Sequence, residues 1–361
     1  MAVDHVNATS INPGHKGLVE TDETVFRIWN DRKNELRSIA EPILQSVAFR
    51  RLSSITFLGI LSPRFASQCQ SPIYKRRSVR NTLGRSYDGS RQSHSLGVAL
   101  IALDICRHLN FPPEVQKYAV AWGLLHDIGN WPLSHTGEYA FSRITNTKTK
   151  EVRLWLVNAD RHAPQRFWVR DALRECDIDP KRLTGLFLGQ PDLALAPLSK
   201  IFRSPLTPDM LEGVWRTGLS FGVDVPSPDR LRNALWKNLF DDTYLESSRS
   251  YTAITFWRAK SAIYRRFFNS PSIARWESAW SLAILRTFGG VSLEESLDLS
   301  EKTVVNRVLA HGLPEVSELH RWKPLQRYVL RSGNKKVLGD IEVENLCSTL
   351  AEETMGGSAP V

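Results

Sequence analysis

The chain has 361 residues, of which 42% are hydrophobic and 24% are charged, a composition ordinary for a globular protein. Its formal net charge of +9 favours anionic partners such as nucleotides or nucleic acid, although a solvated basic surface explains the excess equally well. The four cysteines show no CxxC spacing, which excludes a disulfide framework and indicates reduced thiols in a cytoplasmic protein. No run approaches the ~18 apolar residues of a membrane span, and the N-terminus lacks the apolar segment of a signal peptide.

The N-terminal third is predicted to contain short helices between polar segments. Residues 1–22 are polar, and we expect a flexible tail there. Apolar residues at helical spacing predict one or two short helices from about 24 to 60. The segment 62–92 is rich in Ser, Gly, Arg and Asn and predicts a long basic loop. Its cations at 75–85 either face solvent or bind the phosphates of a substrate or a nucleic acid.

Helical periodicity dominates the rest of the chain. The pattern predicts helices over 94–109, 114–129, 138–144, 166–176, 207–219, 230–240, 251–268 and 272–288. Within this series "DIDP" at 177–180 resembles a helix stop, and Thr-Pro-Asp at 207–209 is a good helix start. There are few alternating apolar runs and no repeats, so we expect an all-α fold. We further expect a C-terminal subdomain over 311–347 and a disordered tail over 348–361.

The stretch "LLHDIGNWPLSHTGE", residues 124–138, carries a His-Asp pair at the end of an apolar run. Burying His126 and Asp127 costs desolvation free energy unless a cation or a hydrogen bond accepts them, and a metal ion would do so. His94 opens another predicted helix, and two helices packed side by side would bring it close. Neighbouring residues of a helix point about 100° apart, so the pair can share one ion only near an irregular helix end. Gly129 and Pro132 supply such an end.

Three segments together resemble the HD-domain phosphohydrolase superfamily: "RQSHSLGVA", "GLLHDIGNWPLSHTGE" and "SPLTPDMLEGVWR". Within it, the chain is most similar to the dGTPase-like deoxynucleotide triphosphohydrolases, which include the sterile-alpha-motif-and-HD type. The likeness extends from "ILQSVAFRRLSSITFLG" to "IYRRFFNSPSIARWESAWSLAI". It implies an HD-type phosphohydrolase domain over 23–310, with its metal core at 91–217, a nucleotide substrate and a homo-oligomer (a dimer or a higher assembly).

The resemblance also implies a role for each matching residue. Four residues match the family's ligands of one divalent ion: His94, His126, Asp127 and Asp209. Three match catalytic positions: His135, Glu138 and His162, the last followed by Ala where the family often has Glu. Three would contact the substrate: Arg91, Asn130 and Arg216. Imidazoles and carboxylates suit Mn, Mg, Fe, Zn or Ni, and a carboxylate one helical turn past His135 can orient that imidazole for proton transfer.

Two departures from the family pattern bear on the substrate. Asn130 stands where relatives commonly have His, and an amide cannot carry a proton at neutral pH. Gly213 and Thr217 stand where the deoxynucleotide-hydrolysing relatives have a Tyr that packs on the deoxyribose and an Asp that binds its 3′-hydroxyl. The metal ligands are kept while this pair is lost. We therefore predict an active phosphohydrolase whose substrate need not be a deoxynucleoside triphosphate, since Gly213 leaves room for a 2′-hydroxyl.

Two other functions stay open at this point. A phosphodiesterase acting on nucleic acid or on a cyclic nucleotide would use the basic loop. A catalytically weak regulatory module would sense a nucleotide without turnover, as Asn130 and the missing His-Glu pair suggest. HD-fold oxygenases need further His ligands for a second iron, and none stands at a matching place.

Overall fold

The computed structural model describes residues 32–65, 68–69, 89–204, 206–235, 251–268 and 270–313. The expected tail at 1–22, the basic loop at 75–85 and the C-terminal tail at 348–361 lie outside the described residues, as does the subdomain at 311–347 apart from its first three residues. The described part of the chain consists of helices and their connections, with a single isolated bridge between Thr56 and Ser90. The predicted all-α fold is confirmed.

Helices and short helical turns make up most of the described chain. The α-helices are α2 (Lys33–Gln45), α3 (Val47–Arg51), α5 (Arg91–His108), α6 (Pro113–Leu125), α7 (Ser134–Ile144), α8 (Thr149–Asn158), α9 (Arg170–Glu175), α10 (Pro180–Leu188), α11 (Ala196–Arg203), α12 (Pro208–Phe221), α13 (Pro228–Leu235), α15 (Tyr251–Ile263), α16 (Pro271–Thr287), α17 (Leu293–Asp298) and α18 (Glu301–His311). The 3₁₀ turns are η1 (Leu52–Ser54), η2 (Gly59–Leu61), η3 (Pro63–Phe65) and η4 (Gln165–Phe167), and the π-helical turn Tyr264–Phe268 extends α15.

Capping side chains fix where the site helices begin. The hydroxyl of Ser90 accepts from the backbone N–H of Ser93 at 3.1 Å and starts α5, and Thr207 does the same for α12. The predicted stop at "DIDP" is confirmed, because α9 ends at Glu175; Asp179 then caps α10, and Pro180 occupies the first turn of that helix. Proline is tolerated there, since an N–H in the first turn has no partner within the helix.

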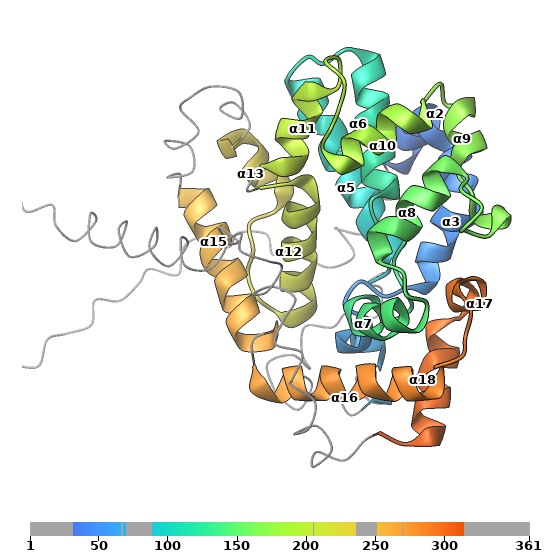
Figure 1. Cartoon of the computed structure of the whole chain (residues 1–361). Coiled ribbons are helices and arrows are strands. Elements are labelled where there is room, and N and C mark those ends of the chain that lie inside the picture. The colour runs from blue at the N-terminus through green and yellow to red at the C-terminus, as the bar shows by residue number, and fades with distance from the viewer. Residues whose placement is uncertain are drawn as a thin grey trace, which may run out of the picture.

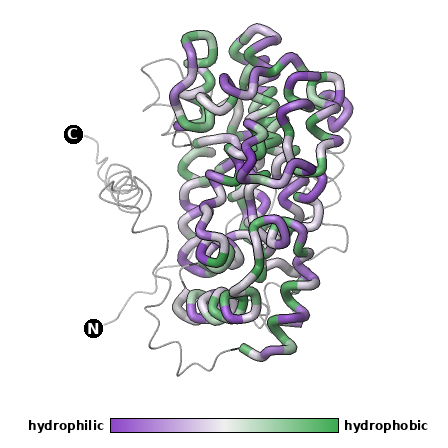
Figure 2. The backbone as a smooth tube through the Cα atoms, turned by 45° about the vertical axis from the view of Figure 1, so that its right-hand side comes forward, coloured by the Kyte–Doolittle hydropathy of each residue, from purple (hydrophilic) through white to green (hydrophobic). Residues whose placement is uncertain are grey.

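Helix α5 is the centre of the fold, and most of its 18 residues are buried. It packs against α6 and α12, while α15 lies beside α12 (Figure 1). Helix α16 crosses below them in that view, packed against α7 and α18. Hydrophobic and hydrophilic residues alternate along the outer helices, as expected when one side of each helix faces a core (Figure 2). No helix of the described segments has the length and apolar character needed to cross a membrane.

Candidate metal centre

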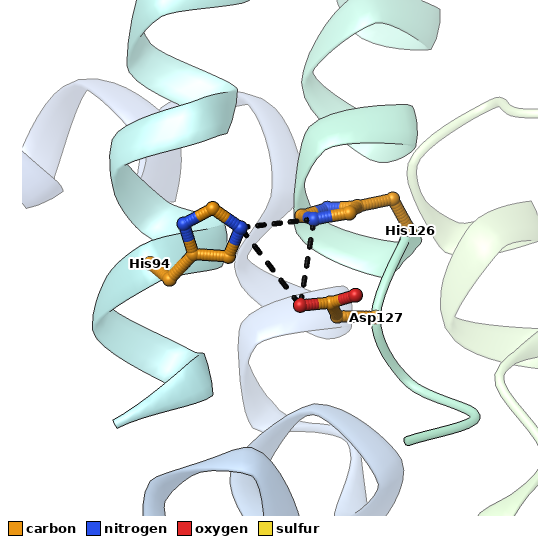
Figure 3. A group of neighbouring side chains, drawn as sticks. All are labelled: His94, His126 and Asp127. Atoms are coloured by element: carbon orange, nitrogen blue, oxygen red, sulfur yellow. Dashed lines mark hydrogen bonds and ion pairs between the residues drawn. The ribbon is translucent and has the colours of Figure 1, made fainter. Parts of the chain in front are cut away.

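Helices α5 and α6 bring three potential metal ligands together (Figure 3). His94 lies in the first turn of α5, His126 is the residue that ends α6, and Asp127 follows it. The two Nε2 atoms of the histidines are 3.2 Å apart. Oδ2 of Asp127 lies 3.8 Å from Nε2 of His94 and 3.5 Å from Nε2 of His126. Helix α6 ends at His126, so the side chains of His126 and its neighbour Asp127 can point toward the same position.

Asp209, in the first turn of α12, reaches the same cluster. Its Oδ1 lies 3.0 Å from Nε2 of His94 and 3.7 Å from Nε2 of His126. The side chain of Asp209 is 49% exposed, whereas that of His94 is fully buried, so Asp209 lies on the open side of the cluster. The fourth ligand position expected from the sequence is therefore next to the other three in space.

The electrostatics of the cluster fit a divalent cation. Nδ1 of His126 is 2.7 Å from the carbonyl oxygen of Gly123. When Nδ1 carries the ring proton and donates it to that oxygen, Nε2 has a free lone pair that faces the cluster. Burial would raise the pKa of Asp127, but the Arg91 guanidinium and the two imidazoles outweigh it and hold that pKa well below its usual range. Burial lowers the pKa of His94, yet the carboxylates of Glu212 and Asp209 prevail and raise it to about 9. Two imidazole nitrogens and two carboxylates are a donor set for Mn, Fe, Zn or Ni.

A buried acid–base pair supports His94 from behind. Nδ1 of His94 forms a hydrogen bond with a carboxylate oxygen of Glu212, whose side chain is fully buried. Nε of Arg216 donates to both carboxylate oxygens of Glu212, at 2.8 and 3.0 Å, and Nη2 of Arg216 donates to Ser93 at 3.2 Å. Gly97 makes room for this pair, because a Cβ there would lie 2.8 Å from Cγ of Glu212. Such a carboxylate fixes the tautomer and the ring orientation of a metal-binding histidine.

This arrangement changes the interpretation of two residues. The sequence placed Arg216 in contact with the substrate, but its side chain is only 3% exposed and is bound to Glu212, on the side of His94 that faces away from the metal cluster. Sequence reasoning gave no role to Glu212. The signal was its position three residues after Asp209 and four before Arg216, which puts all three within two turns of α12.

Arg91, His135 and Glu138 lie beside the metal cluster. Arg91 donates to Asp127 at 2.7 Å and to Ser134 at 2.9 Å, and one of its Nη atoms is 3.5 Å from Nε2 of His135. Nδ1 of His135 is 3.4 Å from a carboxylate oxygen of Glu138. Burial would raise the pKa of Glu138, but hydrogen bonds from His135 and Thr149 outweigh it, and that pKa is lowered. The carboxylate is therefore ionised and holds an imidazole that is 77% exposed.

A cavity of about 650 Å³ opens onto this group. Asp127, Asp209, Arg91, His135 and Glu138 line it at the metal cluster. Its other walls are mainly apolar and come from the 57–61 segment, α12, the end of α15 and α16. A cavity with a few converging charged groups and apolar walls is the usual form of a small-molecule site.

Asn130 and His162 lie away from the cavity at the metal cluster. Neither contributes to the cavity lining found among the described residues. Asn130 is buried, and its carbonyl oxygen accepts from the guanidinium of Arg51 at 2.7 Å, which fixes the turn after the His-Asp pair. His162 pairs with Asp160 at 2.6 Å on the surface and stacks on Trp155. The expected roles in substrate binding and catalysis thus find no support in the geometry around these two residues.

Comparison with known families agrees with this centre. Residues 91–162 match the HD domain family. The chain contains an HD domain. The match begins at Arg91 and includes His94, His126 and Asp127, while Asp209 lies beyond its end.

A stretch of 152 residues, 40% of this chain, is 30% identical to "Uncharacterized protein MG461 homolog" of Mycoplasma pneumoniae. The matched stretch covers 30% of the length of that relative. The segment that matches the HD domain family thus includes the three clustered residues that could hold a metal ion.

Proposed function

We propose that this protein is a metal-dependent phosphohydrolase that hydrolyses a nucleotide, and a (deoxy)nucleoside triphosphate in particular. The observation that carries the proposal is the opening of the His94, His126, Asp127 and Asp209 cluster into a cavity that also exposes His135. Metal ligands, a phosphate-binding cation and a proton-transfer group then face one volume, as phosphoester hydrolysis requires.

Each residue has a chemical task that follows from its contacts. A divalent ion, when bound, offsets phosphate charge and acts as a Lewis acid toward a phosphoryl oxygen. Arg91 holds Asp127 in place and points one side of its guanidinium toward His135, where a phosphate oxygen would lie. His135, with Nδ1 toward Glu138, presents Nε2 to the leaving oxygen of the phosphoester and moves a proton there. Glu138 orients the ring and stabilises its charged form.

The dimensions and chemistry of the cavity support a nucleotide. A volume of about 650 Å³ falls within the range of sites that hold ligands of this size. Its charged end suits a polyphosphate, and its apolar walls, which include Leu58, Met210, Ile263 and Phe268, suit a nucleoside. The net charge of +9 favours the same class of anionic ligand.

The test is a panel of ribo- and deoxyribonucleotides incubated with Mn, Mg, Fe, Zn or Ni, with products separated by chromatography. Release of triphosphate, pyrophosphate or phosphate identifies the bond that breaks. Asp127→Ala should abolish both turnover and bound metal, whereas Asp171→Ala, a carboxylate that is 75% exposed, should change neither. A protein that holds no metal and hydrolyses nothing in the panel would refute the proposal.

A nucleotide-sensing module is the alternative that one observation favours. Asn130 stands where the resembled family commonly has His; it is buried outside the cavity lining and cannot transfer a proton. Tight binding of a nucleotide with no turnover in any metal would establish the sensor. Hydrolysis of a cyclic nucleotide or a nucleic acid in place of free nucleotides would establish a phosphodiesterase.

A further inference from the structure

The wall of the cavity next to the metal cluster is built on one stripe of α12. Asp209, Gly213 and Thr217 are spaced by four residues, so they lie one above the other along the helix, and all three line the cavity. The stripe therefore leads from the metal cluster to the region one and two turns farther along α12. The part of a substrate that adjoins the reacting phosphate would lie against it.

Phe57 fills the space beside Gly213. A Cβ at Gly213 would lie 3.1 Å from Cζ of Phe57 and 3.8 Å from Cε1 of His94. An aromatic ring from a distant segment thus lies directly beside Gly213, and the expected room for a 2′-hydroxyl stays a prediction, since Gly213 still lines the cavity. The glycine is what allows the ring to approach α12 so closely.

Phe57 is held in place on several sides. Its ring centroid lies 4.4 Å from that of His94, and the Arg91 guanidinium carbon lies 4.7 Å from the Phe57 centroid. The backbone is anchored too: the N–H of Phe57 donates to the carbonyl of Gly89 at 2.6 Å, and its carbonyl accepts from Arg91 at 3.2 Å. The ring is therefore a fixed part of the wall.

The neighbouring polar group offers little to a sugar hydroxyl. The hydroxyl of Thr217 donates to the carbonyl oxygen of Gly213 at 2.6 Å, which leaves it one neutral acceptor. Met210, Val214 and Leu58, which line the cavity nearby, carry no hydrogen-bonding side chain. Apart from Thr217, the α12 wall of the described cavity is therefore apolar beyond the charged end, while Lys260, Tyr264 and Glu277 line the cavity from the end of α15 and from α16.

We propose that Phe57 and Gly213 form an apolar subsite for the sugar of the nucleotide, so that the protein accepts ribose, deoxyribose and dideoxyribose alike. This inference rests on the proposed nucleotide substrate. A site built to hydrogen-bond a hydroxyl rejects the analogue that lacks it by roughly 10⁴- to 10⁵-fold. One neutral hydrogen bond to Thr217 is worth at most about tenfold.

The experiment compares kcat/KM for a nucleoside triphosphate and for its 2′-deoxy and 2′,3′-dideoxy forms, with base and metal held constant. We expect the three values to agree within about tenfold. A larger preference for one sugar, with hydrolysis observed, overturns the subsite and leaves the phosphohydrolase standing. If nothing is hydrolysed, the proposed function fails, and the subsite is decided by calorimetric Kd values of the same three compounds under the same tenfold criterion. Absence of binding by all three overturns both proposals.

Variants test the role of Phe57 directly. Phe57→Gln places an amide beside the sugar and should raise the ratio of the ribo to the dideoxy compound by up to about tenfold. Phe57→Leu stays apolar and should keep the ratio of the wild type, even where the loss of its contact with Arg91 lowers both rates. Phe111→Gln, at a half-buried phenylalanine that does not line this cavity, is the matched control. A ratio unchanged in folded Phe57→Gln would contradict the assignment; if that variant does not fold, the wild-type ratios decide.

Discussion

The substitution Glu212→Gln tests whether Glu212 helps His94 to bind the metal while His94 itself is kept. The amide keeps the size of the carboxylate and can still accept from Nδ1 of His94, but it removes the charge that pairs with Arg216. Loss of a carboxylate behind a metal-binding histidine typically lowers metal affinity 10- to 100-fold, which corresponds to about 1.4–2.7 kcal/mol. The same change removes the charge of Glu212 from beside the guanidinium of Arg216, which is only 3% exposed. Breaking a buried pair in this way costs about 3–5 kcal/mol, and the retained hydrogen bonds favour the lower end.

Calorimetric titration with Mn or Zn measures the first effect, and urea unfolding of the metal-free protein measures the second. Glu294→Gln is the matched control, since that carboxylate is 57% exposed and pairs with Arg166 at the surface. The control should lose no more than about 1 kcal/mol and no metal affinity. A folded Glu212→Gln protein that binds metal as tightly as the wild type would refute the idea that Glu212 orients His94.

Three further outcomes follow from named contacts. His135→Ala should keep its bound metal and lose ~10²-fold or more in turnover, and Glu138→Gln should lose less; equal activity of both variants and the wild type would remove the pair from the reaction. Gly97→Ala should weaken metal binding by moving Glu212, whereas Gly290→Ala, where a Cβ would meet nothing within 4 Å, should leave metal binding unchanged in the same titration. Burial raises the pKa of Glu301 from 4.5 to about 7, so its contribution to stability is complete below pH 4.5 and is lost as the pH rises through 7. Between pH 4.5 and 8 the wild type should therefore lose about 3 kcal/mol more of its unfolding free energy than Glu301→Gln loses. Urea titrations that give the same difference between the two proteins at both pH values would contradict this.

The sequence was most informative where local patterns are strong. Apolar periodicity predicted α5, with its start three residues too late, and together with the Thr-Pro-Asp start it predicted α12. The His-Asp pair predicted a cluster at the end of α6. The start of α7 was predicted four residues too late. Leu133 and Ser134 adopt positive φ angles there, which no residue preference of Leu signals.

The remaining features depend on contacts between distant segments. Arg216 has the charge of a phosphate-binding residue, and only the position of Glu212 on the buried side of α12 shows that it serves the protein itself. Phe57 lies 156 positions before Gly213 in the chain, and nothing in either local sequence indicates that the ring fills the gap. Helices α8 and α17 were not predicted because they are only 10 and 6 residues long, and packing against the core decides such short helices.

Because α5 is buried, ion binding at His94 should affect hydrogen exchange along the whole helix. A helix packed on α6 and α12 with most of its residues buried exposes its amides to hydrogen exchange only when the protein unfolds globally. Because His94 belongs to that helix, an ion present at 100 times its Kd would slow exchange by about 100-fold along its length. The slowing would reach Ile101, which lies about two turns from His94 along the helix and contributes no ligand.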